Sequence, residues 1–235
     1  MTKIALTMLA LLLLGGCGTP AESGKLPDTE TTQPAASVEA AASTITESEE
    51  VPQVKTHDTQ ETNILIAYFS RTGENYGVGY IEKGNTSIVA DIIAEQTGGD
   101  LFEIRTLSAY PDNYEETTDI AKQEQKENAR PELADNLEDI SDYDVVFIGY
   151  PVWWGDMPMA VYTFLERHDL SGKTIVPFCT HAGSGLSSTE SSIAALFPNA
   201  TVLDGLAISG STAQNNKEET DGAVMEWLQQ NGVVE

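Results

Sequence analysis

The sequence predicts an α/β fold in which a doubly wound parallel sheet of five strands is flanked by helices. Five short apolar runs rich in β-branched residues recur at regular spacing, and segments with helical periodicity lie between them. The run at 145–148 is apolar throughout, which is typical of a strand buried on both faces of a parallel sheet. The five predicted strands are residues 63–70, 100–106, 144–152, 174–179 and 201–208.

Two of the intervening segments show the period of a helix that buries one face. Apolar residues recur at i, i+1, i+4 and i+5 in residues 88–93 and again in residues 223–228. Gly232 follows the second segment and is predicted to end that helix. Because strands alternate with helices, right-handed crossovers are expected to place helices on both faces of the sheet.

The first residues predict export. Lys3 precedes an apolar run at 4–14, which is long enough for the core of a signal peptide but too short to span a bilayer. The run ends in Leu-Gly-Gly-Cys at 14–17, which resembles the lipobox of bacterial lipoproteins. The resemblance implies that residues 1–17 are a lipoprotein signal peptide and that Cys17 is acylated, so that lipid alone anchors the exported protein to the extracytoplasmic side of the cell membrane.

Residues 18–61 predict a disordered acidic tether. They are rich in Ala, Ser, Thr, Glu and Pro and lack the apolar clusters from which a core is built. The folded domain is therefore expected to occupy residues 62–235.

The composition excludes several classes of function. A formal net charge of −25 at pH 7 repels nucleic acid and anionic lipid, but it is compatible with a small cofactor or a basic docking partner. The sequence has two cysteines: Cys17 ends the lipobox, whereas Cys179 lies in a predicted strand. It contains no Cys-x-x-Cys motif and no paired Cys/His spacing. We therefore expect no disulfide and no zinc or iron–sulfur site.

Ligands of open parallel sheets bind beyond the carboxyl ends of the strands, where the strand order reverses. The loop at 70–75, after the first strand, combines hydroxyls, an amide and glycine just before a helix. Backbone N–H groups and side-chain donors in such a loop can surround a phosphate, and the helix dipole adds to the attraction. The same residue types also form ordinary turns and caps.

Two further loops at this edge are unusual. Residues 150–156 place two indoles and a tyrosine beside Gly155, which suits stacking on a planar ring, although two tryptophans equally suit a core. Residues 180–185 contain two glycines, where a backbone can approach a ligand closely. The following residues 187–190 form a capping-box pattern, Ser-Ser-Thr-Glu, which argues for structure as much as for function.

Taken together, these three loops resemble the flavodoxin family over residues 62–235, with the motifs Ser-Arg-Thr-Gly at 70–73 and Tyr-Pro-Val-Trp-Trp-Gly at 150–155. The resemblance implies a flavodoxin-like sheet of order 2-1-3-4-5 that binds flavin mononucleotide (FMN) without a covalent bond. The first loop would hold the phosphate, and the other two would flank the isoalloxazine ring. The implied FMN-binding residues are Ser70, Arg71, Thr72, Asn85, Thr86, Pro151, Val152, Trp153, Trp154, Gly155, Thr180, His181, Ala182, Gly183 and Gly185.

The sequence departs from the family in its phosphate loop. Residues 74–83 interrupt the usual Thr-Gly-Asn-Thr pattern, which resumes at Gly84, and we expect Asn85 and Thr86 to supply the missing contacts. The inserted segment carries Tyr76 and Tyr80 and is either a lid over the site or an idle surface loop.

In this interpretation the flavin carries the redox chemistry, and no catalytic side chain is required. Gly155 is the candidate for the backbone beside flavin N5, where a flexible peptide can turn its carbonyl toward N5–H after reduction. Asp156 and the acidic surface are expected to disfavour an anionic reduced ring and to lower the potential. His181 either touches the pyrimidine edge of the ring or is a solvated turn residue, and Cys179 is expected to pack as a small apolar residue.

Three functions are compatible with these residues. The first is electron transfer at the extracytoplasmic face of the membrane, with a redox protein or a small molecule as partner. The second is an FMN-dependent NAD(P)H:quinone-type reductase, although nothing in the sequence marks a nicotinamide site. The third is a flavin-free binding or scaffold domain that has lost the cofactor through the interrupted phosphate loop.

Overall fold

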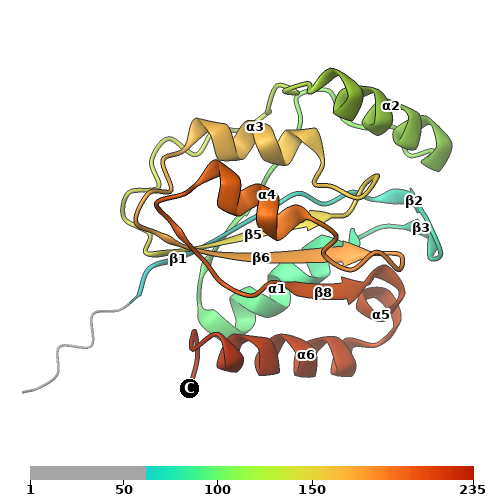
Figure 1. Cartoon of the computed structure of the whole chain (residues 1–235). Helices are drawn as coiled ribbons and strands as arrows, with labels where there is room; N and C mark the ends of the chain where they lie inside the picture. Colours follow the sequence, from blue (N-terminus) through green and yellow to red (C-terminus); the bar gives the residue numbers. More distant parts are fainter. Residues whose placement is uncertain (1–61) are drawn as a thin grey trace, which may run out of the picture. The chain divides into compact units, whose positions relative to one another are not determined.

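The computed structural model describes residues 62–235 of the chain (Figure 1). The predicted signal peptide at 1–17 with its acylated Cys17, and the predicted tether at 18–61, lie outside the described residues. Every run predicted as a strand contains one, and the last run contains two. The strands of the main sheet are β1 (Ile64–Tyr68), β4 (Asp100–Glu103), β5 (Val145–Pro151), β6 (Thr174–His181), β7 (Thr201–Val202) and β8 (Leu206–Ser209).

All pairings in the main sheet are parallel, in the order β4-β1-β5-β6-β7, and β8 also pairs with β6. Counted as five strands along the chain, this is the order 2-1-3-4-5, so the predicted doubly wound fold is confirmed. The fifth strand is split because it holds an extra residue. Ile175 of β6 pairs with Val202 of β7, and Phe178 of β6 pairs with Leu206 of β8. The segment from Val202 to Leu206 is therefore one residue longer than the segment of β6 that it faces. An extra residue of this kind disrupts the ladder locally.

Helices cover both faces of the sheet, as predicted. In the view of Figure 1, α1 (Asn85–Thr97), α5 (Gly210–Asn215) and α6 (Lys217–Gln230) lie below the sheet. The helices α3 (Met159–Arg167) and α4 (Thr189–Leu196) lie above it, and α2 (Tyr114–Glu127) stands at the upper right. α2 packs against α3 and against the strand β2 (Gly73–Asn75) rather than over the middle of the sheet.

The side chains of β1 alternate between two cores. Ile64, Ile66 and Tyr68 join the core formed with α1 and α6, whereas Leu65 and Ala67 join the core formed with α3. All five are buried, which explains why the strand shows no alternation of polar and apolar residues. Burial of one large apolar side chain contributes roughly 1.5–3 kcal/mol, so the two cores hold the sheet and the loops at its edge firmly.

The two periodic segments form α1 and α6, with their buried apolar residues at 89–93 and 224–228. α6 ends at Gln230, and Gly232 takes a φ of 67° just beyond it. This left-handed conformation often follows the end of a helix, so the predicted stop at Gly232 is confirmed.

The predicted capping box at 187–190 is wrong. α4 begins at Thr189 with Ser188 as its N-cap, so Glu190 is the second helical residue. A capping box needs the glutamate at the third helical position. The Glu190 carboxylate instead accepts a hydrogen bond from the backbone N–H of Gly205 at 2.8 Å, which ties α4 to the loop between β7 and β8.

Cys179 lies in β6, fully buried in the core, as expected for a small apolar residue. Burial raises the pKa of its thiol to about 12, so the thiol is protonated at neutral pH. Across residues 62–235, no group of three or more metal-ligating side chains is close enough to hold an ion, and no helix has the length and apolar character needed to cross a bilayer.

Gly149 of β5 provides a test of the packing in the sheet. A Cβ at this position would lie 2.1 Å from the ring of Phe178 on β6, with which it is paired. We expect Gly149→Ala to lower the free energy of unfolding by about 1–3 kcal/mol. Gly222→Ala is the matched control: its Cβ would meet nothing within 4 Å, and it should stabilise α6 by up to about 1 kcal/mol. Chemical unfolding measures both, and equal stability of the two variants would contradict the packing.

Candidate functional site

Loops at the carboxyl ends of β5 and β6 enclose a cleft of about 390 Å³. This volume lies within the range of small-molecule sites in proteins. The start of α1, the start of α2 and a hairpin close its other sides. The residues that line it are Asn75, Tyr76, Asn85, Tyr114, Pro151, Val152, Trp153, Trp154, Gly155, Thr180, His181, Ala182, Ser184 and Gly210.

The start of α1 borders this cleft and suits an anion. Its N-cap Gly84 makes no side-chain capping bond, and its first turn holds no acidic residue, although the chain as a whole is strongly acidic. α2 and α6, in contrast, each have an asparagine cap and two acidic residues in the first turn. Free N–H groups and the helix dipole attract negative charge, so α1 offers an anion site next to the cleft.

The loop after β1 is pressed against this helix start. Ser70 Oγ accepts a hydrogen bond from the backbone N–H of Ser87 at 3.0 Å, and so it provides the cap that Gly84 lacks. A Cβ on Gly84 would lie 2.1 Å from Ser70 Oγ and 2.7 Å from the carbonyl oxygen of Arg71. Only glycine allows this approach, and through it residues 70–72 and the start of α1 form one continuous surface.

The inserted residues form a small antiparallel hairpin of β2 and β3 (Gly79–Ile81). The base of the hairpin is fastened to the segment that leads into α2. The Glu74 N–H donates to the Asp112 carbonyl at 2.8 Å, and the Glu74 carboxylate accepts from the Tyr114 N–H at 3.1 Å. Tyr76, near the tip of the hairpin, lines the cleft and is itself 67% exposed. The insertion is therefore a wall of the cleft rather than a loop remote from it.

The Arg71 guanidinium is engaged by backbone carbonyls. Its Nε and Nη2 donate to Pro111 at 3.2 and 2.8 Å, Nη2 also donates to Asp112 at 2.7 Å, and Nη1 donates to Glu74 at 2.5 Å. Burial lowers the pKa of this guanidinium, while the nearby carboxylates of Asp112 and Glu74 raise it. The side chain thus braces the hairpin against the start of α2, which leaves the backbone of Arg71 for the phosphate contact predicted from the sequence.

Two of the predicted residues meet beneath the cleft. The hydroxyl oxygens of Thr86 and Thr180 lie 2.8 Å apart, and both residues are buried. Each hydroxyl finds its partner in the other, which satisfies both groups away from water. Asn85 is held in turn by Gln214 of α5, whose Nε2 donates to its Oδ1 at 2.9 Å. The start of α1 and the end of β6 are therefore fixed relative to each other.

The loop after β5 closes in a tight turn. The N–H of Trp153 donates to the Asp156 carbonyl at 2.9 Å, and the N–H of Asp156 donates to the Trp153 carbonyl at 3.0 Å. Trp154 and Gly155 between them have φ values of 53° and 81°, the pattern of a type I′ turn. This conformation costs a non-glycine residue on the order of 1 kcal/mol, which is offset by a hydrogen bond from Trp154 Nε1 to the Thr118 carbonyl of α2 at 3.0 Å.

The two indoles have different surroundings. Trp153 is half-buried and packs edge-to-face on Phe69 and Tyr110, with ring centroids 5.4 and 5.2 Å away. Trp154 is 52% exposed, and the Lys122 ammonium lies 4.8 Å from its ring centroid. The sequence left two roles open for the tryptophans, packing in a core and stacking on a ligand ring. Trp153 is placed for both, because it packs against a core and also lines the cleft.

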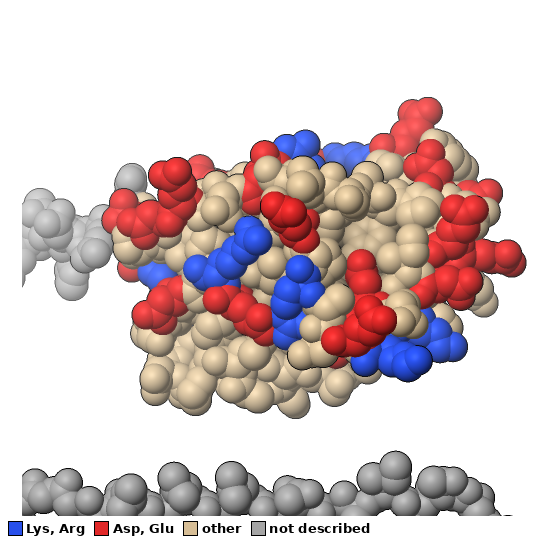
Figure 2. Space-filling model, turned by 90° about the horizontal axis from the view of Figure 1, so that it is seen from above, with Lys and Arg blue, Asp and Glu red and all other residues tan. Residues whose placement is uncertain are grey.

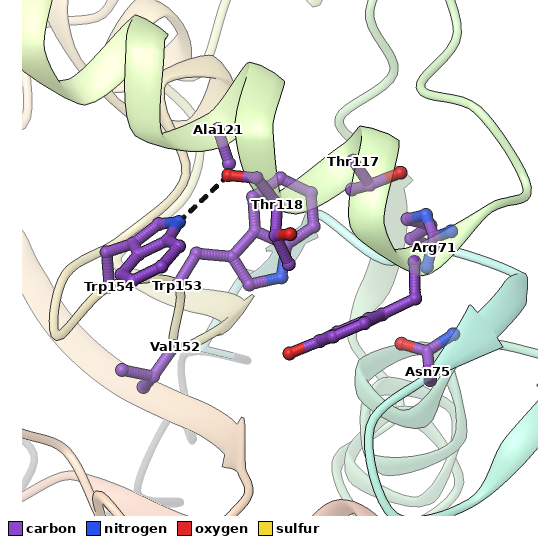
Figure 3. A pocket seen from close by; sticks show the side chains of 9 residues that line it. Arg71, Asn75, Thr117, Thr118, Ala121, Val152, Trp153 and Trp154 are labelled. Atoms are coloured by element: carbon purple, nitrogen blue, oxygen red, sulfur yellow. Dashed lines mark hydrogen bonds between the residues drawn. The ribbon is translucent and has the colours of Figure 1, made fainter.

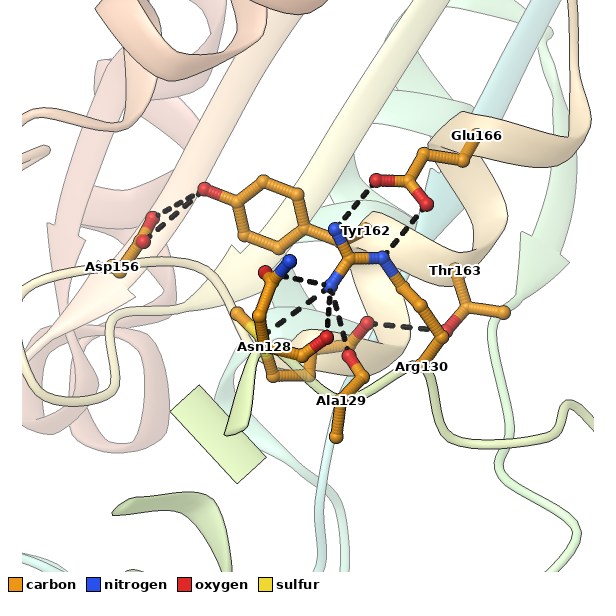
Figure 4. Close-up of polar contacts among 8 residues, drawn as sticks. Asn128, Ala129, Arg130, Asp156, Tyr162, Thr163 and Glu166 are labelled. Carbon is orange, nitrogen blue, oxygen red and sulfur yellow. Dashed lines mark hydrogen bonds and ion pairs between the residues drawn. The ribbon is translucent and has the colours of Figure 1, made fainter. Parts of the chain in front are cut away.

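Asp156, at the end of the turn, is held by α3 (Figure 4). Its carboxylate accepts hydrogen bonds from the Met157 N–H at 2.8 Å and from the Tyr162 hydroxyl at 2.9 Å. Burial and the hydrogen bond to Asp156 raise the pKa of Tyr162 to about 12, so this phenol remains a donor. Arg130 lies over the Tyr162 ring and binds Glu166 with two N–H groups, at 2.7 and 2.5 Å. The turn, α3 and the segment after α2 therefore form one supported unit.

His181, after β6, presents a defined tautomer to the cleft. Its Nδ1 accepts a hydrogen bond from the Gly183 N–H at 2.9 Å, and burial lowers the pKa of the ring. The neutral ring must then carry its proton on Nε2, which makes that atom a donor. Gly183 and Gly185 have φ values of 118° and 59° and shape this loop without lining the cleft.

The structure brings most of the predicted site residues together. The residues of the prediction that line the cleft are Asn85, Pro151, Val152, Trp153, Trp154, Gly155, Thr180, His181 and Ala182. Ser70, Arg71 and Thr72 do not line the cleft; they line a different hollow of about 410 Å³ toward the end of β4, which shares no lining residue with it. Thr86 lies beneath the cleft, and Gly183 and Gly185 lie beside it.

Sequence reasoning missed five residues that line the cleft. Gly210 follows β8 directly, so the rule about carboxyl ends, applied to the fifth strand, could have found it. Ser184 lies inside the loop at 180–185, which the sequence indicates as part of the site. Asn75 ends the loop at 70–75, and Tyr76 lies in the inserted segment that the sequence left open as a lid over the site. Tyr114 begins α2, a largely polar helix whose sequence carries no signal that it borders a site.

The face that carries α2, α3 and α4 holds acidic side chains at both ends, with Lys and Arg side chains between them. In Figure 2 acidic side chains gather at the right-hand edge, over the end of the molecule where α2 lies. Several cations of the domain are paired with carboxylates, which reduces their attraction for other anions. These pairs are Lys83 with Asp91, Arg105 with Asp135, Arg130 with Glu166 and Lys217 with Asp221.

Residues 63–230 match the sequence profile of a family described as Flavodoxin. The chain is similar to a protein described as a flavoprotein from Bacteroides eggerthii DSM 20697, with 30% identity, a TM-score of 0.57, and coverage of 74% of this chain and 99% of that chain. A second such protein, from Bacteroides uniformis ATCC 8492, shares 26% identity over 72% of this chain and 99% of its own, with a TM-score of 0.58.

The same fold occurs in a flavoprotein from Lactobacillus acidophilus NCFM that was crystallised in complex with FMN. It shares 24% identity over 71% of this chain and 98% of its own, with a TM-score of 0.52. No curated protein sequence matches the chain.

The lowered pKa of His181 predicts a dependence of stability on pH. Unfolded histidine titrates near pH 6.5. Below that pH the unfolded chain takes up a proton that the folded ring resists, so stability is lost as the pH falls from about 6.5 toward the folded pKa, and it is unaffected above this window. Unfolding curves between pH 7 and 5 should therefore show a steeper loss for the wild type than for His181→Gln. Parallel profiles would contradict this expectation, and His168, whose pKa burial also lowers, is present in both proteins.

Proposed function

The chain belongs to the flavodoxin family, and from this membership we propose that residues 62–235 bind FMN without a covalent bond and transfer electrons through it. The observation that carries the proposal is the junction of an anion-accepting helix start with an aromatic-lined cleft of about 390 Å³. FMN has the two matching parts, a phosphate and a planar ring system. Neither part of the site alone would point to it.

The residues of the chain suit both parts of the cofactor. The loop at 70–72 together with Asn85 and Thr86 would hold the phosphate through N–H groups and hydroxyls, with no cation required. Residues 151–155 and 180–185 would hold the ring. FMN supplies one- or two-electron transfer when it is bound. The chain supplies orientation and exclusion of water, through the fixed contact between Thr86 and Thr180 and through the supported turn at 153–156.

Two polar groups in the cleft are suited to the edges of the ring. A Cβ on Gly155 would meet only Ser187 Oγ, at 3.5 Å, so the peptide at this position has room to turn its carbonyl toward the N5–H of a reduced ring. His181 Nε2 would donate to an acceptor on the pyrimidine edge, because its Nδ1 is occupied. In this proposal both groups bind the ring, and neither transfers a proton to a substrate. An electron carrier needs no catalytic side chain, because the flavin itself supplies the electron transfer.

The place and the partner follow from the predicted N-terminus. The proposal is that lipid at Cys17 anchors the domain, that residues 18–61 give it reach, and that electrons pass at the extracytoplasmic face to a redox protein or a small molecule. The acidic face over α2 favours a basic or neutral partner over an anionic one. The same charge opposes binding to nucleic acid, so the proposal includes no nucleic-acid partner.

The flavin-free alternative loses its main argument. It rested on the insertion at 74–83 as an interruption of the phosphate loop. The insertion instead closes on itself as a hairpin, and Gly84 rejoins residues 70–71 at van der Waals distance.

Direct binding tests the proposal. The purified chain should take up one equivalent of FMN, with flavin absorbance that remains after dialysis. Gly84→Ala should weaken FMN binding at least about tenfold, because its Cβ pushes Ser70 and Arg71 away from α1. Gly222→Ala, on α6, should leave binding unchanged. A wild-type protein that stays colourless and does not quench FMN fluorescence at micromolar concentrations would refute the proposal.

The charge of Asp156 should tune the potential. Its carboxylate is fixed beside the turn at 153–156, where it opposes negative charge on a reduced ring. Asp156→Asn is therefore expected to raise the midpoint potential by on the order of 10–30 mV, the effect of one partly screened charge. Asp142→Asn, just before the amino end of β5 and so far along the strand from the turn at 153–156, is the control. Spectroelectrochemical titration measures both, and an unchanged midpoint in Asp156→Asn would exclude this role.

A further inference from the structure

The side chain of Gln214 holds the two residues that flank Gly84. Its Nε2 donates to the Lys83 carbonyl at 2.7 Å and to Asn85 Oδ1 at 2.9 Å. Gln214 belongs to α5, which packs against α1, and it lies outside the lining of the cleft. Gly84 is therefore fixed from two directions, by its close contact with the loop at 70–71 and by Gln214 through its two neighbours.

These contacts fix the orientation of the Asn85 amide. A backbone carbonyl only accepts hydrogen bonds, so the atom of Gln214 that contacts the Lys83 carbonyl must be the amide nitrogen. The same nitrogen donates its second hydrogen to Asn85, so the atom of Asn85 that receives it must be the oxygen. The nitrogen of the Asn85 amide, Nδ2, is therefore the end that Gln214 leaves free.

Asn85 Nδ2 lies next to the lining of the cleft. A Cβ on Gly210, which lines the cleft, would lie 2.5 Å from Nδ2 but 3.8 Å from Oδ1, so the nitrogen is the nearer end of the amide. Only glycine at position 210 leaves room for it. Within residues 62–235 Nδ2 has no hydrogen-bond partner, and it is not among the buried unpaired atoms, so it is open to a ligand. Asn85 thus offers the cleft a donor and not an acceptor.

The cations near the start of α1 are engaged elsewhere. Residues 70–86 contain two, Arg71 and Lys83. The Arg71 guanidinium lies beside the start of α2 (Figure 3), where it donates to two backbone carbonyls, and the Lys83 ammonium pairs with Asp91 of α1. The groups that this segment offers a phosphate are therefore neutral donors. Their orientation matters, because an amide turned over would present its oxygen and repel the anion.

We propose that Gln214 is a positioning residue that makes the site selective for a phosphorylated flavin. The inference rests on the proposed FMN function. Gln214 acts through Asn85, whose amide nitrogen it keeps turned toward the phosphate. The loops at 150–155 and 180–185, which would hold the ring, do not depend on this contact. Riboflavin, which has the same ring and ribityl chain but no phosphate, is therefore bound without help from Gln214.

Two dissociation constants, one for FMN and one for riboflavin, test this role. Gln214→Leu keeps most of the volume of the side chain but removes both of its donors, so the Asn85 amide is free to turn. The variant should bind FMN at least about tenfold more weakly than the wild type, the effect of losing a hydrogen bond to a charged group. Its affinity for riboflavin should stay within about twofold of the wild type, whereas a damaged fold would weaken both flavins alike. Quenching of flavin fluorescence at constant ionic strength measures both constants.

Asn215→Leu is the matched control. Asn215 is the next residue of α5, and its side chain donates only within that helix, to the Ser211 carbonyl at 3.0 Å, so both affinities should be unchanged. Gln214→Glu is a second variant of nearly the same shape. Its carboxylate can accept from Asn85 Nδ2 but cannot donate to the Lys83 carbonyl, so it should turn the amide over and lose at least as much FMN affinity as Gln214→Leu. If both Gln214 variants keep the wild-type ratio of the two dissociation constants, Gln214 has no such role.

Nuclear magnetic resonance of the ¹⁵N-labelled chain reports on the amide itself. At saturating flavin, the side-chain NH₂ signals of Asn85 should differ between the FMN and riboflavin complexes of the wild type, and this difference should be lost in Gln214→Leu. An equal difference in both proteins would overturn the inference and leave the proposed function standing. A wild-type chain that binds neither flavin would refute the proposed function and this inference together.

Discussion

The contact of Gly84 with the backbone of residues 70–71 is the constraint on which the rest of the site depends. It brings the loop after β1 and the start of α1 to van der Waals distance, and Ser70 then caps the helix from a position seventeen residues earlier. Everything between these points must leave the sheet and return to the same place, which is why the inserted residues form a hairpin with adjacent ends. The insertion therefore extends the wall of the cleft without disturbing its base.

The cleft combines rigid and adjustable parts. The hydroxyl pair of Thr86 and Thr180 and the bracing of Arg71 leave little freedom at the base of the site. The turn at 153–156 is supported from behind by Asp156 and Tyr162, yet Trp154 and Gly155 at its tip both have positive φ values. Backbone strain held in place by a supported frame is common at functional sites, because the frame fixes the position while the tip can respond to a ligand.

Much of the fold and part of the site could be predicted from the sequence. The strands were recognisable because β1 and β5 are buried on both faces, and the order of the sheet followed from the family motifs at 70–73 and 150–155. The capping box was misassigned because the pattern at 187–190 does not record where α4 begins, which is one residue later than the box requires, and Glu190 binds the distant Gly205 instead. The sequence raised a place over the site as one of two alternatives for the inserted segment, but it could not decide between them. The role of Tyr114 could not be found at all, since it arises from contacts between distant segments that no local pattern encodes.

The position of α2 has a further consequence. Only two of its residues, Thr117 and Ala121, are buried, and it rests on α3 and the hairpin instead of the sheet. Detaching such a helix exposes little apolar surface, so the free energy of this local opening is far smaller than that of unfolding the domain. Amide hydrogens along α2 should accordingly exchange with solvent long before those of α1, and each opening would give a small molecule a way in while the loops beneath stay folded.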